Sequence, residues 1–166
     1  ANFAAIVGTP VPAVIATDYQ ALKRMCEKKT DLPILAIDTD GMELYDKGEE
    51  KAYLALFTAF AKEKYEVCKE KVGILGMTPQ DVSDLKAADK VREELKKEGK
   101  EAICYGMGDG LEAVERASEV GKNIVVSAAA LEAAKYLEKT FGTPYEIGYP
   151  AAGELVPNLD YQGKKI

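Results

Sequence analysis

Short apolar runs alternate along this chain with longer segments in which apolar residues recur every three or four positions. The apolar runs predict buried strands at residues 3–7, 34–37, 72–75, 102–105, 124–126 and 144–147. The amphipathic segments predict helices at residues 11–25, 49–65, 81–99, 111–117 and 128–140. The pattern contains no hairpin signal, and strands that are joined through helices run parallel with right-handed crossovers. The sequence therefore predicts an α/β fold with a doubly wound, Rossmann-like parallel sheet.

The centre of this pattern is the segment from Lys71 to Asp84, where a buried strand ends at Gly76 and a Thr-Pro turn leads into a long helix. The segments before and after it repeat this arrangement, so we expect more than one α/β unit. The predicted parts are an N-terminal βαβ portion that ends a first α/β domain of order βαβα (1–66), the main α/β domain on parallel strands (67–150) and a C-terminal extension (151–166).

Two of the predicted helices have a regular apolar face. In the first, the apolar positions are spaced at i, i+3, i+4 and i+7, as Tyr53, Leu56, Phe57 and Phe60. In the second, the apolar positions are Leu85, Ala88, Val91 and Leu95. We expect both faces to be buried, with Phe57 and Leu95 in the core.

The composition limits the chemistry of this chain. Its 166 residues include no histidine, which removes the usual general base and the commonest metal ligand. Cys26, Cys68 and Cys104 lie far apart on different predicted elements, so we expect reduced thiols and no metal or iron–sulfur site within this chain. Reduced thiols are typical of a cytoplasmic protein.

Charge and hydropathy exclude two further classes of function. The net charge is -6, and Lys and Glu are mixed along the predicted helices, so we expect no nucleic-acid partner. The mean hydropathy is -0.19 and no apolar run approaches the ~20 residues of a membrane span, so we expect no membrane segment. The sequence opens on an apolar run without a basic leader, so we expect a piece of a longer protein rather than a signal peptide.

The candidate binding site follows from the predicted topology. In an open parallel sheet, ligands bind outside the carboxyl ends of the strands, near the point where the strand order reverses. The helices that begin near Asp81 and Leu111 favour an anionic group at this edge, whereas the charge of Asp109 opposes it. The predicted cofactor-binding residues are Gly76, Met77, Thr78, Gly106, Met107, Gly108 and Ser127.

Other kinds of site at this edge are less well supported. The run GMGDG at residues 106–110 is similar to a dinucleotide-binding loop, but Leu111 stands where G-x-G-x-x-G requires its third glycine. No Gly-Lys-Ser/Thr occurs, so the chain has no P-loop. Asp38, Asp40 and Asp109 either hold a hard cation or cap neighbouring helices.

The order of four sequence segments points to a known family: TPVPAVIATDYQAL, LPILAIDTDG, KVGILGMTPQD and GKNIVVSAAALEAAKYLEKTFGTPYEIGYP. Over residues 3–150 the chain resembles the nitrogenase component 1 type oxidoreductase family, which includes nitrogenase and the protochlorophyllide reductases. The resemblance implies a subunit of similar α/β domains that hold metal clusters or a tetrapyrrole between them. It also implies that electrons arrive from an ATP-dependent iron–sulfur reductase.

The chain departs from this family where ligating cysteines are expected. Pro10 stands at the position of a cluster ligand, and Val126 and Ser127 stand near that of a cofactor ligand. The resemblance therefore implies an excised part of two domains of a reductase subunit, inactive alone and without a cofactor of its own. In the full-length protein, an iron–sulfur cluster or tetrapyrrole, the other domains or subunits and the iron–sulfur ATPase reductase would be its partners. The alternatives are a non-redox small-molecule binding domain on a doubly wound sheet and a nucleotide-binding or glycosyltransferase-like half.

Overall fold

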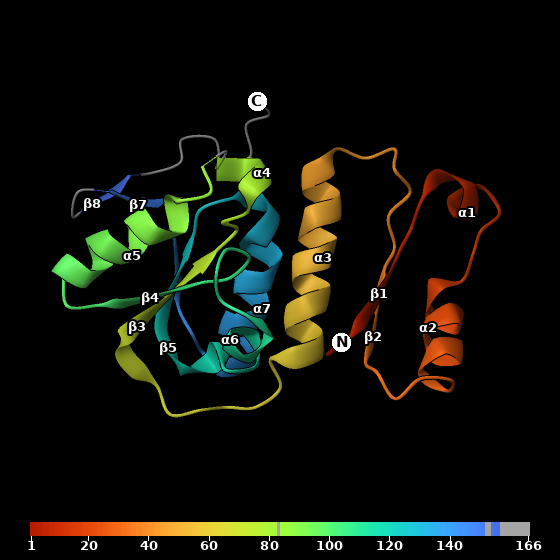
Figure 1. The fold of residues 1–166 in the computed structure, drawn as a ribbon, viewed down its shortest axis with the longest axis horizontal. Helices are drawn as coiled ribbons and strands as arrows, with labels where there is room; N and C mark the ends of the chain where they lie inside the picture. Colours follow the sequence, from red (N-terminus) through yellow and green to blue (C-terminus); the bar gives the residue numbers. More distant parts are fainter. Residues whose placement is uncertain (83, 152–153, 157–166) are drawn as a thin grey trace.

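The computed structural model describes residues 1–82, 84–151 and 154–156 (Figure 1). The strands are β1 (Ala4–Val7), β2 (Ile34–Ile37), β3 (Cys68–Leu75), β4 (Glu101–Cys104), β5 (Val120–Val125), β6 (Tyr145–Ile147), β7 (Tyr149–Ala151) and β8 (Glu154–Val156). The α-helices are α1 (Pro10–Val14), α2 (Tyr19–Glu27), α3 (Tyr45–Phe60), α4 (Pro79–Val82), α5 (Ala87–Lys97), α6 (Leu111–Glu115) and α7 (Leu131–Phe141). Short 3₁₀ helices are η1 (Ala117–Glu119) and η2 (Ala128–Ala130).

The first six strands form two separate parallel sheets. Strand β1 pairs with β2, and the main sheet has the order β4-β3-β5-β6 with every pair parallel. The chain passes from β3 to β4 on one side and then to β5 on the other, so the strand order reverses at β3. Helices lie on both faces of the main sheet (Figure 1). The predicted α/β fold with a doubly wound parallel sheet is confirmed.

Helix α3 lies between the two sheets (Figure 1). It packs against β2 on one side and against α6, α7 and η2 on the other. Phe57 of α3 is fully buried and meets the ring of Tyr105 edge-on, with centroids 5.1 Å apart, as the predicted apolar face requires. The helix begins at Tyr45, before its predicted start at residue 49, and ends at Phe60 rather than at residue 65.

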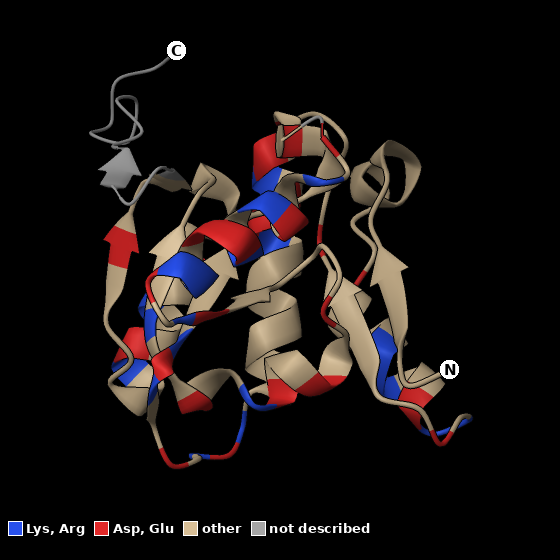
Figure 2. Cartoon of the chain, turned by 60° about the vertical axis from the view of Figure 1, so that its left-hand side comes forward, with Lys and Arg blue, Asp and Glu red and all other residues tan. Residues whose placement is uncertain are grey.

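Helix α5 covers the opposite face of the main sheet. Val91 and Leu95 are buried in one cluster with Val72 and Ile74 of β3, so the prediction for Leu95 is confirmed. Lys, Arg, Asp and Glu residues are interspersed along this helix (Figure 2). Leu85, which was expected on the same apolar face, is 77% exposed because it lies before the helix begins. That part of the prediction is wrong.

Two of the predicted helices are interrupted. Residues 11–25 form α1 and α2 instead of one helix, because Ala16 adopts a left-handed φ of 53°. Asp18 then caps α2 by accepting a 2.9 Å hydrogen bond from the backbone N of Ala21. Residues 81–99 likewise contain the end of α4 and all of α5.

The last described strands form an antiparallel hairpin that the sequence pattern did not indicate. Tyr149 of β7 lies opposite Val156 of β8. Each strand has three residues, which is too short for an alternating pattern to be visible. Of the predicted extension at 151–166, residues 152–153 and 157–166 lie outside the described part of the chain. No helix among the described residues is both long enough and apolar enough to span a membrane.

The proposed boundary after residue 66 separates α3 from β3 along the chain. The two parallel sheets lie on opposite sides of it in sequence, and α3 contacts elements of both parts. The division into domains stays a prediction.

Candidate functional site

The carboxyl ends of β3 and β5 are packed directly against each other. Gly76 follows β3 with a φ of 85°, and a Cβ there would lie 2.8 Å from the Cβ of Ser127 and 3.1 Å from that of Ala130. The backbone N of Val126 donates a 2.9 Å hydrogen bond to the backbone O of Leu75 at the same place. The crevice that open sheets offer at this point is therefore filled by the protein itself, and Gly76 permits the close approach.

The predicted loops after β3 and β4 lie side by side. A Cβ at Gly106 would lie 3.0 Å from the backbone O of Met77 and 3.6 Å from Cγ2 of Thr78. The side chains of Met77 and Met107 are buried in the core cluster beneath α5. The structure thus brings the loops together, but both methionines contribute packing rather than an accessible side chain.

The hydroxyl groups predicted for the site are used by the chain. Thr78 Oγ1 accepts a 3.4 Å hydrogen bond from the backbone N of Asp81, and Ser127 Oγ accepts one of 3.4 Å from that of Ala129. Helices α4 and α6, which begin near this edge, have only four and five residues. Helices this short offer a weaker dipole to an anion than the sequence pattern indicated.

The glycine-rich loop at 106–110 is closed by an ion pair. Asp109 Oδ2 accepts hydrogen bonds of 2.6 Å from the backbone N of Cys104 and 2.9 Å from Nη2 of Arg92. The same Nη2 lies 3.4 Å from the backbone O of Met107, and a Cβ at Gly108 would lie 2.8 Å from it. Arg92 therefore neutralises the charge of Asp109, which was expected to oppose an anion.

The structure does not bring the three predicted cation-binding carboxylates together. Asp40 Oδ1 accepts hydrogen bonds of 2.8 Å and 3.3 Å from the backbone N atoms of Met42 and Glu43, whereas Asp109 is held in the main sheet. The cysteines lie on α2, β3 and β4. Within the residues that the structure describes, no three His, Cys, Asp or Glu side chains converge as a metal site.

An apolar cleft of about 330 Å³ lies between the two sheets, against α3. Thr78 and Gly106 are the predicted site residues that line it. At its base, the hydroxyl of Tyr53 donates a 2.9 Å hydrogen bond to the backbone O of Tyr105. A concave apolar space with a few polar groups is typical of a small-molecule site. The lining residues are Phe3, Ala5, Leu35, Ile37, Glu49, Ala52, Tyr53, Leu56, Thr78, Tyr105 and Gly106.

Glu49 is an acidic residue that lines this apolar cleft. Its side chain is half-buried, and burial together with the carboxylates of Asp81 and Asp46 raises its pKa. One buried oxygen of each of these three carboxylates has no hydrogen-bond partner among the described residues. The other oxygen of Asp81 accepts a 3.0 Å hydrogen bond from the hydroxyl of Tyr45. A carboxyl group that retains its proton more readily than usual is a suitable proton donor.

The sequence analysis missed this carboxylate group. The helix was predicted to begin at residue 49, so Asp46 was not placed on a helix with Glu49. The spacing of three residues between them was the available signal, since it places both on one helix face. Their approach to Asp81 depends on how α3 packs beside α4, which is not visible in local sequence.

The family profile described as "Nitrogenase component 1 type Oxidoreductase" matches residues 2–151. The chain belongs to this family. Two solved structures, "Nitrogenase Cp1 at pH 6.5" and "Nitrogenase Cp1 at pH 5", have the same fold, with TM-scores of 0.73 and 0.72 and 20% sequence identity in both cases. A comparison with curated proteins finds no match.

The component 1 type chain described here is short beside those structures. Each similarity covers 87% of this chain, but only 28% and 30% of the respective nitrogenase chains. The family match confirms the resemblance seen in the sequence segments, and the activity of a whole subunit remains a matter for proposal.

Proposed function

We propose that this chain is the part of a nitrogenase-like reductase subunit that holds one edge of a cofactor between two α/β units, residues 1–66 and 67–150. The observation that carries the proposal is the apolar cleft between the two sheets, with Glu49 as its ionisable group. The predicted residues Thr78 and Gly106 are part of this cleft. The other predicted residues lie at the strand ends, outside its lining.

The donor atoms of this chain do not fit an iron–sulfur cluster. Such clusters are held by several thiolates, and the cysteines here lie on separate elements. Burial raises the pKa of the Cys104 thiol to about 11, which opposes formation of a thiolate ligand. A cluster in the whole subunit would take its thiolates from other parts of the protein.

The apolar lining fits the face of a tetrapyrrole better. Phe3, Leu35, Ile37 and Leu56 would contact such a ring, and Glu49 would hold a proton beside it. A bound tetrapyrrole supplies a conjugated double bond to be reduced. Reduction consumes protons as well as electrons, and the raised pKa of Glu49 suits it to hold one at neutral pH better than an ordinary carboxyl group.

The partners in this proposal follow from the family. Other domains or subunits of the same reductase would complete the site, and an ATP-dependent iron–sulfur protein would deliver electrons. We place the assembly in the cytoplasm, where the unpaired thiols stay reduced.

The experiment that tests this function is an absorption titration of the 166-residue chain with protoporphyrin IX, a metal-free tetrapyrrole. Ala52→Phe fills the cleft and should weaken binding at least about tenfold, a loss of about 1.4 kcal/mol. Ala55→Phe is the matched control, because Ala55 is also a half-buried alanine of α3 but lines a different pocket. Thermal unfolding establishes that both variants are folded.

Equal loss in both variants, or no binding by the unaltered chain, would contradict the tetrapyrrole proposal. Binding of an apolar dye such as anilinonaphthalene sulfonate in the cleft, without binding of the porphyrin, would instead favour the non-redox small-molecule domain. In that case Ala52→Phe should still abolish the dye signal.

A further inference from the structure

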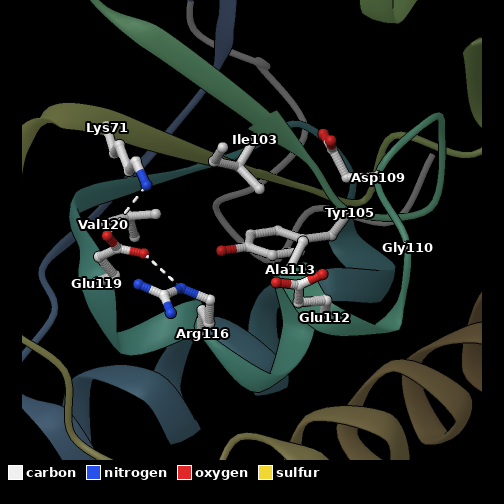
Figure 3. A pocket seen from close by; sticks show the side chains of 10 residues that line it. All are labelled: Lys71, Ile103, Tyr105, Asp109, Gly110, Glu112, Ala113, Arg116, Glu119 and Val120. Carbon is white, nitrogen blue, oxygen red and sulfur yellow. Dashed lines mark hydrogen bonds and ion pairs between the residues drawn. The ribbon is translucent and has the colours of Figure 1, made fainter.

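A second pocket, of about 310 Å³, lies beneath α6 and η1 (Figure 3). Its lining shares only Tyr105 with the cleft and extends to Lys71 in the middle of β3 and to Val120 at the start of β5. Its walls include Ile103, Ala113 and Val120. None of the predicted cofactor-binding residues lines it, and of the three predicted cation-binding carboxylates only Asp109 does.

The innermost polar group of this pocket is the hydroxyl of Tyr105. The residue is 1% exposed, its hydroxyl has no hydrogen-bond partner among the described residues, and Figure 3 shows it pointing into the pocket. Phe57 packs against one side of the ring. The ring also lies against Gly73, where the absence of a side chain gives it room: a Cβ there would lie 2.9 Å from Cε2 of Tyr105. Packing therefore fixes the direction of the hydroxyl.

A second buried polar side chain lies beside this ring. Asn123 is 0% exposed, and neither atom of its amide has a partner among the described residues. A Cβ at Gly73 would overlap its Oδ1, so the side chains of Asn123 and Tyr105 lie next to each other over Gly73 of β3. Buried polar groups in folded proteins are nearly always satisfied. Two unsatisfied side chains at one place indicate that a polar group, from water or a ligand, is needed there.

The mouth of the pocket carries separated charges. Glu119 accepts hydrogen bonds of 3.0 Å from Nζ of Lys71 and 3.0 Å from Nε of Arg116, so its two oxygens are both used. The group of two cations and one anion leaves one positive charge in excess. The terminal Nη atoms of Arg116 make no hydrogen bond within the described part of the chain, although the guanidinium lies 4.7 Å from the ring centroid of Tyr65.

Glu112 provides the negative side of the mouth. It precedes Arg116, the residue that follows α6, by four residues, but among the described residues no ion pair joins them. Asp109, which also lines the pocket, is already neutralised by Arg92. A simple anion would meet the attraction of Arg116 and the repulsion of Glu112. A zwitterion satisfies both.

We propose that this pocket binds a small α-amino acid, with its carboxylate at Arg116, its ammonium at Glu112 and its side chain inside. The inner wall selects an apolar side chain that ends in a hydrogen-bonding group, which meets the hydroxyl of Tyr105. The volume of about 310 Å³ is at the lower end of the range of small-molecule sites and suits a ligand of this size.

The test is an NMR titration of the 166-residue chain with four probes: L-tyrosine, L-phenylalanine, tyramine and 3-(4-hydroxyphenyl)propionate. At about 2 mM L-tyrosine, which suffices for a millimolar Kd, the amide signals of Ile103, Ala113 and Val120 should shift. The other probes lack the hydroxyl, the carboxylate or the ammonium respectively, and each should bind about tenfold more weakly. Equal binding of all four, or shifts confined to other residues, or no shifts, would overturn the proposal.

Two variants with matched controls test the residues. Tyr105→Phe should raise the Kd for L-tyrosine about tenfold and leave that for L-phenylalanine unchanged, and Arg116→Gln should weaken both amino acids. Tyr19→Phe is the control for the first, because Tyr19 is 6% exposed, also has an unpartnered hydroxyl among the described residues and lies outside this pocket. Arg24→Gln, on α2, removes the same charge elsewhere. Loss of binding in the controls but not in the pocket variants would refute the assignment. The comparison of the four probes uses the unaltered chain, so it tests the proposal even if a variant does not fold.

Discussion

The hydroxyl of Tyr53 on α3 donates a 2.9 Å hydrogen bond to the backbone O of Tyr105, at the end of β4. This bond joins the helix between the sheets to the residue whose side chain enters the second pocket. Tyr53 and Phe57 stack on the same helix with ring centroids 6.3 Å apart, and Phe57 in turn meets Tyr105. The base of the cleft and the inner wall of the second pocket are therefore parts of one aromatic cluster.

Tyr53→Phe should destabilise the fold. The substitution retains the ring but leaves the buried O of Tyr105 without its donor, which costs about 1 to 3 kcal/mol. Urea unfolding measures the change in free energy. Tyr45→Phe is the control, because its hydroxyl bonds Asp81 at an exposed position and its loss should cost less than about 0.5 kcal/mol. Similar losses in the two variants would argue against a buried bond at Tyr105.

Gly76→Ala should be more destabilising than Gly99→Ala. Both glycines have a left-handed φ, of 85° and 73°, so each substitution incurs about 1 to 2 kcal/mol of backbone strain. At Gly76 the new Cβ also clashes with Ser127, which brings the expected total to about 2 to 5 kcal/mol. A Cβ at Gly99 would meet nothing within 4 Å. Denaturant unfolding of the pair isolates the contact between β3 and β5, and equal effects would show that these strand ends are not packed together.

Leu95→Ala should cost about 2 to 5 kcal/mol of unfolding free energy, because Leu95 is buried between α5 and β3. Leu85→Ala should change stability by less than about 0.5 kcal/mol, since that side chain is exposed. The two substitutions delete the same atoms, so thermal unfolding of the pair compares burial directly. A large effect at Leu85 would mean that the structure has the wrong start for α5.

Glu49 should make the free energy of unfolding fall as the pH rises, which is opposite to the usual effect of a carboxyl group. Burial and the charges of Asp81 and Asp46 raise its pKa above the ordinary value of 4.5, so the folded chain retains this proton after the unfolded chain has released it. The resulting stabilisation is fully present below pH 4.5 and is lost as the pH rises through the folded pKa. The free energy of unfolding of the unaltered chain, measured relative to Glu49→Gln, should therefore fall as the pH rises above 4.5.

Glu119→Gln is the control with the opposite sign. Hydrogen bonds from Arg116 and Lys71 lower the pKa of Glu119, so its contribution is present above 4.5 and is lost as the pH falls through the folded pKa. Urea unfolding at several pH values gives both profiles. A flat Glu49 profile would show that Glu49 is solvated, and one in the direction of Glu119 would show that a partner stabilises its carboxylate. Either result would contradict its burial in the cleft.

The sequence by itself determined the class of fold and much of the core. The spacing of apolar residues is a local property, so it indicated the parallel α/β alternation, the burial of Phe57 and Leu95 and the edge at which the strand-end loops gather. It failed where a few dihedral angles and caps decide the outcome, as at Ala16 and Asp18, which divide one amphipathic segment into two helices. It also failed for the short hairpin of β7 and β8.

Only the tertiary structure decided what the loops and pockets contain. The contact of Gly76 with Ser127 and the pairing of Arg92 with Asp109 join residues that are distant or unpatterned in sequence. The pKa of Glu49 is raised by burial and by the charges of Asp81 and Asp46, and Asp81 belongs to a separate helix, α4. The hydroxyl of Tyr105 faces a pocket because three strands and α6 surround it. Burial and charge at such sites depend on contacts between separate elements, and local periodicity carries no information about those contacts.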